Sequence, residues 1–86
     1  MTNITANEAE VLNAILESDY QHSDEKDEVV GTAVWTWSVA DYVEAQGKAF
    51  SGVVSSLVKK GLVGSQEGGD DAVMWITNEG WDAASA

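Results

Sequence analysis

The sequence predicts a mainly α-helical α+β domain, in which three helices form the core and a small β-hairpin follows them. Three observations favour this fold. Apolar residues recur at helical spacing in two segments, a glycine separates two short helical segments, and two β-prone segments flank a glycine-containing turn. The chain of 86 residues has the length of one domain, which we assign to residues 1–86 with an acidic loop insertion at 19–32.

The first helix is expected over residues 6–18. Thr5 and Glu8 have the spacing of a capping box, in which the threonine hydroxyl accepts from the Glu8 backbone N–H and the Glu8 carboxylate reaches back. One apolar stripe follows at helical spacing and comprises Val11, Leu12, Ile15 and Leu16. Residues 19–28 are highly charged and lack apolar periodicity, so we expect a solvated and mobile loop there.

A short strand is expected next, over residues 33–37, because this segment is β-branched and aromatic. Trp35 and Trp37 lie two positions apart and would therefore point to the same face of the strand. The simplest interpretation is that both rings fill the core. The alternative is that one ring is exposed and anchors a partner.

The second helix is expected over residues 39–45 and should be short. Ser38 and Asp41 repeat the capping-box spacing at its start. Gly47 suits the left-handed backbone position that ends such a helix. The apolar face would comprise Val39, Tyr42 and Val43.

The third helix has the most regular pattern, and its apolar residues are Phe50, Val53, Val54, Leu57 and Val58. Gly61 closes it, and two short helices joined by a tight glycine-containing turn form a helix-turn-helix motif. Residues 62–66 and 72–77 predict the two strands of a hairpin, the wing, after which Thr77 caps a closing helix. One core is predicted to contain Val11, Leu12, Ile15, Leu16, Val39, Val43, Phe50, Val54, Leu57, Leu62 and Ile76.

This order of elements is that of a winged helix-turn-helix, and two segments resemble the MarR family. Residues 53–63 resemble the end of that family's recognition helix, where two basic residues, Gly, Leu and an aliphatic residue lead into the wing. Residues 76–80, an aliphatic residue, Thr, two polar residues and Gly, resemble the exit from the wing. The resemblance covers residues 5–82 and implies a small DNA-binding transcriptional regulator from a bacterium, an archaeon or a phage.

The chain departs from the MarR pattern in two places. The wing carries Glu67, Asp70 and Asp71 where the family usually carries arginine. Few residues flank positions 5–82, whereas the family dimerises through long terminal helices. We therefore expect a monomer, or a homodimer with an interface unlike that of MarR proteins.

The charge of the chain is strongly negative but unevenly distributed. It has 15 acidic residues, four lysines and no arginine, for a net charge of -11. Nucleic-acid-binding domains are normally basic, so the total charge opposes DNA binding. Residues 46–63, however, hold three of the four lysines and no acidic residue.

The candidate DNA-binding residues lie on the exposed side of the third helix and at its end: Lys48, Ser51, Gly52, Ser55, Lys59 and Lys60. The small residues would allow close approach to the major groove, and the lysines would contact phosphates. The helix has no Arg, Asn or Gln for a bidentate base contact, so sequence would be distinguished through serine, lysine and DNA shape. The alternative is that these residues are the solvated face of a core helix.

Two classes of function stay open. The first is a winged-helix transcriptional regulator whose partner is double-stranded DNA. The second is a winged helix that binds a protein partner instead, or an acidic mimic of DNA, which the acidic wing favours. A host living at high salt would also select an acidic surface, whatever the function.

Other classes are disfavoured by the sequence. It contains no cysteine and no Walker, G-x-S-x-G or H-E-x-x-H motif, so we expect neither an enzyme nor a cofactor. His22 lies among acidic residues without the spacing of a metal-binding loop, and we expect no metal. No apolar run approaches ~18 residues and the N-terminus is polar, so we expect no membrane contact and a cytoplasmic protein.

Overall fold

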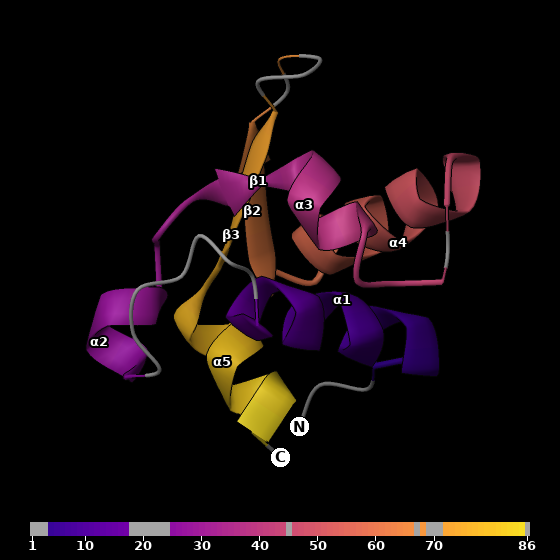
Figure 1. Cartoon of the computed structure of the whole chain (residues 1–86). Helices are drawn as coiled ribbons and strands as arrows, with labels where there is room; N and C mark the ends of the chain where they lie inside the picture. Colours follow the sequence, from indigo (N-terminus) through magenta and orange to yellow (C-terminus); the bar gives the residue numbers. More distant parts are fainter. Residues whose placement is uncertain (1–3, 18–24, 45, 67, 69–71, 86) are drawn as a thin grey trace.

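The computed structural model describes residues 4–17, 25–44, 46–66, 68 and 72–85. The elements are α1 (Ala6–Glu17), α2 (Lys26–Val29), β1 (Val34–Trp35), α3 (Thr36–Ala40), α4 (Lys48–Lys59), β2 (Val63–Gln66), β3 (Val73–Ile76) and α5 (Asn78–Ser85). Figure 1 shows the sheet standing on α1, with α3 and α4 on one side and α2 on the other. The α5 helix extends beneath, against α1 and β3.

The three strands form one antiparallel sheet in the order β1-β3-β2. In the central strand, Met74 pairs with Val34 of β1, and Ile76 pairs with Val63 of β2. Alternate residues of a strand point to the same face, and both Met74 and Ile76 are fully buried on theirs. The β2–β3 hairpin is the predicted wing.

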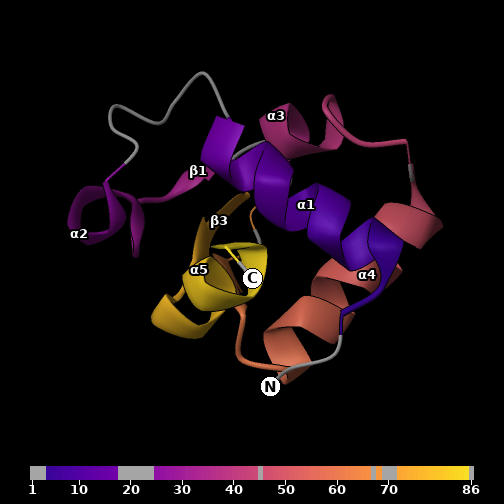
Figure 2. The same ribbon diagram turned by 90° about the horizontal axis from the view of Figure 1, so that it is seen from below.

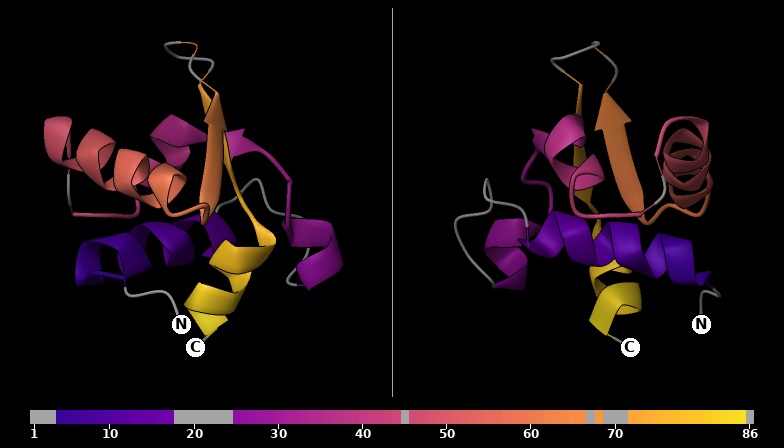
Figure 3. Two further views of the ribbon diagram at one scale, coloured as in Figure 1. Left: turned by 180° about the vertical axis from the view of Figure 1, so that it is seen from behind. Right: turned by 45° about the vertical axis from the view of Figure 1, so that its right-hand side comes forward.

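The core lies between the sheet and the helices, and α1 contacts α3, α4, α5 and β3 (Figures 2 and 3). Buried apolar residues from every layer meet there, namely Val11, Leu12, Ala14, Ile15, Val29, Val34, Val39, Val43, Phe50, Leu57, Leu62, Val63, Met74 and Ile76. The predicted core residues are all buried together except Leu16 and Val54, which are only partly buried against the core.

The predicted strand over residues 33–37 is too long, because only Val34 and Trp35 pair with β3. The backbone N–H of Thr36 donates to the carbonyl of Ala72, at 3.0 Å, and from Thr36 onward the chain is helical. Trp37 is therefore on a helix and half exposed, and Trp35 is only partly buried, so the expectation that both rings fill the core is wrong. Tertiary pairing outweighs the β-propensity of this segment.

The second helix begins earlier than predicted. Ser38 lies inside α3 and is buried, so it is no N-cap. Gly47 does have a positive φ of 60°, but it precedes α4 instead of ending α3. The open end of α3 is closed by the Gln46 amide, which donates to the carbonyls of Ala40 and Val43, both at 2.8 Å.

Part of the predicted acidic loop forms a single helical turn, α2. Its Val29 is buried, and the Gly31 N–H that follows donates to the Ile76 carbonyl at 3.0 Å. These contacts attach residues 26–31 to the sheet, which the charge pattern alone did not predict. The expected mobility of residues 19–24, including His22, lies outside the described residues, as does most of the wing turn.

Candidate nucleic-acid interface

The outer face of α4 presents five of the six candidate residues to solvent. Lys48 lies at its start, Lys59 at its end, and the small residues Ser51, Gly52 and Ser55 lie between them, all exposed. The buried side of the same helix carries Phe50 and Leu57. This polarity follows from the 3.6-residue period of the apolar positions.

Gly52 lies in open space on this face. A Cβ built there would meet no atom within 4 Å, so the fold does not require glycine at this position. Glycine inside a helix costs about 1 kcal/mol relative to alanine. A smooth surface for a close-approaching partner is one physical reason to keep it.

An open groove of about 460 Å³ separates α4 from the wing. It is lined by Thr36, Phe50, Ser51, Val54, Ser55, Val58, Lys59, Ser65, Gln66 and Ala72. The right-hand view of Figure 3 looks along α4, which lies beside β2. Ser51, Ser55 and Lys59 belong both to the groove and to the candidate set, so helix and hairpin form one continuous surface.

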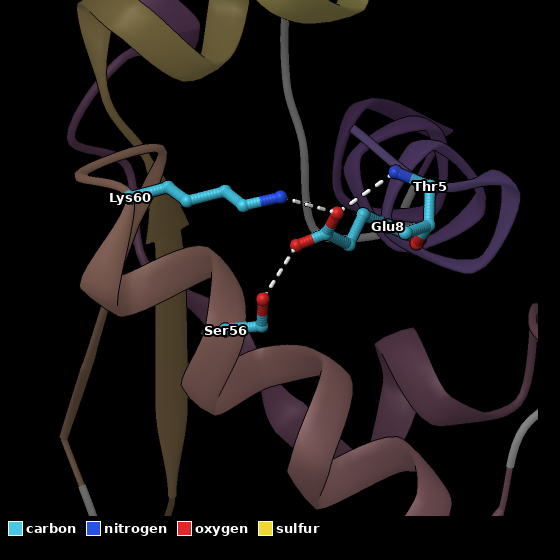
Figure 4. A network of polar contacts seen from close by, with 4 residues as sticks. All are labelled: Thr5, Glu8, Ser56 and Lys60. Carbon is cyan, nitrogen blue, oxygen red and sulfur yellow. Dashed lines mark hydrogen bonds and ion pairs between the residues drawn. The ribbon is translucent and has the colours of Figure 1, made fainter. Parts of the chain in front are cut away.

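Lys60 is the candidate residue that the structure separates from the rest. Its side chain turns toward α1, where Nζ lies 2.8 Å from Oε1 of Glu8 (Figure 4). Only 33% of the Lys60 side chain is exposed. Lys59 and Lys60 are therefore neighbours in sequence but face different parts of the molecule.

Glu8 forms the predicted capping box and also bridges two helices. Its Oε1 accepts from the Thr5 N–H at 2.8 Å, and its own N–H donates to the Thr5 hydroxyl at 3.1 Å. Its Oε2 accepts from the Ser56 hydroxyl at 2.7 Å. The sequence predicted the local part of this network but carried no signal for the contacts to Ser56 and Lys60.

The ionised form of Glu8 is strongly favoured. Burial of this 2%-exposed residue raises the pKa, but the Lys60 ammonium and the hydrogen bonds from Thr5 and Ser56 outweigh burial. Together they lower the pKa of Glu8 from 4.5 to about 2. The carboxylate is thus a permanent negative charge at neutral pH.

Some described acidic residues lie close to α4, namely Glu8 at its last turn and the exposed Asp41 and Glu44 just before it, and others lie farther away. Asp27 and Glu28 are on α2, at the end of the molecule opposite α4 (Figures 1 and 2). Glu79 and Asp82 are on α5, beneath the sheet. Neither α4 nor β2 contains an acidic residue.

The described residues contain neither a membrane-spanning helix nor a cluster of metal-ligating side chains. No helix there is long and apolar enough to cross a membrane. No three metal-ligating side chains gather within that part of the chain.

Comparison with known proteins identifies the fold. No protein-family model matches the chain, and no curated protein matches its sequence. Among solved structures, TubR from Bacillus megaterium pBM400 superimposes with a TM-score of 0.72, covering 96% of this chain and 84% of that one. The fold is a winged helix-turn-helix. At 18% sequence identity the likeness establishes the fold alone, and membership of the MarR family is not supported by a family match.

Proposed function

We propose that this winged helix binds double-stranded DNA through α4 and acts as a small transcriptional regulator. One observation carries the proposal: the exposed face of α4 is free of acidic residues and bears small side chains between Lys48 and Lys59. The acidic residues of α2 and α5 lie elsewhere on the molecule. In helix-turn-helix proteins the second helix of the motif enters the major groove, and here that helix is α4.

The small residues of α4 could approach the bases of a duplex, and the groove beside α4 could receive its backbone. Ser51, Gly52 and Ser55 permit close approach of the helix to the base edges. Lys59, on the groove wall, would contact a phosphate, and Ser65 of β2 also lines this groove. Gln66, also on β2, brings an amide to this surface, and an amide can bond an adenine in bidentate fashion.

The affinity of one protomer should be low. Each neutralised phosphate adds about -0.9 to the slope of log affinity against log salt concentration, so Lys48 and Lys59 together allow about -1.8. Useful affinity would then require a homodimer that presents two α4 helices about 34 Å apart.

A mobility-shift assay with duplex DNA at low and high salt tests the proposal. Gly52→Leu is expected to fold at least as stably as wild type, because its side chain enters open space and leucine favours helices. The variant should weaken DNA binding on the order of tenfold, about 1.4 kcal/mol, because the leucine side chain would keep α4 away from the base edges in the major groove. Asn13→Leu, at an exposed position of α1, is the matched control and should bind as wild type.

Two results would contradict DNA binding by α4. If wild type binds no duplex even at low salt, then α4 is not a DNA-reading helix. Undiminished binding by Gly52→Leu would likewise place the contact elsewhere on the molecule.

A protein-binding role is the second candidate, and exposed aromatic residues favour it. Trp37 exposes 50% of its surface and Tyr42 44%, both at or just after α3. Large exposed aromatic side chains are typical anchors of protein interfaces. An acidic mimic of DNA belongs to the same class, since it would also bind a protein. This candidate would be favoured if the wild-type chain does not bind DNA and Trp37→Ser changes its self-association in sedimentation experiments.

A further inference from the structure

We infer that Glu8 keeps Lys60 away from DNA and uses it to fix α4 on α1. Lys60 is then a positioning residue, while its neighbour Lys59 contacts phosphate. This inference rests on the proposed function, and it divides the basic residues at the end of α4 into two kinds.

The two lysines differ in what surrounds them. Lys59 lines the groove between α4 and the wing, on the proposed DNA side. Lys60 is the C-cap of α4, and its ammonium lies 2.8 Å from the Glu8 carboxylate on the α1 side (Figure 4). While Glu8 holds Lys60 on the α1 side, a duplex lying along the groove would meet the first lysine and not the second.

The contact is built so that a phosphate cannot easily replace it. Both carboxylate oxygens of Glu8 are occupied, Oε1 by Thr5 and Lys60 and Oε2 by Ser56. Glu8 is also 2% exposed. Moving Lys60 to a DNA phosphate would leave a buried carboxylate without its counter-charge, which is strongly unfavourable.

The same carboxylate fixes the direction of α4. Ser56 and Lys60 are four residues apart and so lie on one face, in successive turns of the helix. One carboxylate at the first turn of α1 thereby holds the last turn of α4, just before Leu62 enters the wing. Leu57, next to Ser56 in the chain, is fully buried in the core. The orientation of the proposed recognition helix therefore depends on Glu8.

A matched pair of lysine variants tests the division. Methionine keeps the aliphatic stem of lysine and removes only the charge. Lys59→Met should flatten the salt slope of DNA binding by about 0.9, and Lys60→Met should leave the slope unchanged. Equal flattening by both variants would overturn the inference.

The reverse experiment releases Lys60 instead. Glu8→Gln should steepen the salt slope by about 0.9, because a further ammonium becomes available to phosphate. A purely structural role of Glu8 would weaken binding without steepening the slope. The double variant with Lys60→Met should return the wild-type slope. If Glu8→Gln does not fold, the lysine pair still decides the matter.

A measurement without DNA distinguishes failure of this inference from failure of the proposed function. The Glu8 carboxyl, followed by carbon NMR in the wild-type chain, should titrate near 2, and its midpoint should rise in Lys60→Met. A wild-type midpoint near 4.5 would show that the contact is not formed, and the inference would fail even if DNA binds. If no variant binds DNA, the role of keeping Lys60 from phosphate falls together with the proposed function, whatever the titration shows.

Discussion

At Glu8 the fold places a charge where burial alone would disfavour it. Burial raises its pKa, yet Lys60 and the hydrogen bonds from Thr5 and Ser56 leave that pKa at about 2, below the ordinary 4.5. A carboxyl group with a lowered pKa in the folded chain stabilises the fold above its unfolded pKa and loses this effect as the pH falls through its folded pKa. The contribution of Glu8 is therefore complete above about pH 4.5 and disappears toward pH 2.

Glu8→Gln should lower the free energy of unfolding by roughly 3 kcal/mol at neutral pH, since each tenfold change in proton affinity is worth about 1.4 kcal/mol. The gap between wild type and variant should narrow as the pH falls from about 4.5 toward 2. Urea denaturation of both proteins across this range measures the gap. A gap of constant size at every pH would contradict the lowered pKa.

The helices α4 and α5 each contain one glycine, and the two glycines have opposite surroundings. A Cβ at Gly52 would meet no atom within 4 Å. A Cβ at Gly80 would overlap the Leu62 carbonyl and lie 2.8 Å from a side-chain carbon of Ile76. Gly80 is therefore what allows α5 to pack against the start of the wing.

The same substitution at both sites should therefore have opposite effects. Gly52→Ala is expected to raise the free energy of unfolding by up to about 1 kcal/mol, because alanine favours the helix and nothing obstructs it. Gly80→Ala should lower it by about 1–3 kcal/mol, because backbone must shift to admit the methyl group. Chemical denaturation of the two variants and wild type compares them directly. Changes of the same sign would contradict the packing of α5.

Elements defined by strong local patterns are predictable from the sequence. Element ends that are set by tertiary contacts are not. The Thr5–Glu8 capping box and the apolar period of α4 are confirmed because neighbours in sequence determine them. The end of β1 is set instead by pairing with β3, which the local residues do not encode. Likewise, the direction of Lys60 depends on Glu8, 52 positions away.

At the scale of the molecule, the described acidic residues are unevenly distributed around α4, within a chain of net charge -11. The exposed lysines of α4 face one side, while α2 and α5 carry acidic residues elsewhere (Figure 1). If it binds DNA, we expect it to approach with the acid-free face of α4 toward the duplex. Salt screens the repulsion from the acidic residues as well as the attraction of the lysines, so binding should depend on salt less than in a basic domain.

The proposed use of α4 is tested most directly by NMR of the isotope-labelled chain titrated with a short duplex at low salt. We predict that the backbone amide signals that move are those of α4 and of β2 beside the groove, while those of α2 and α5 stay in place. Absence of any movement, or movement centred on Trp37 and Tyr42 with α4 unaffected, would contradict DNA recognition by α4.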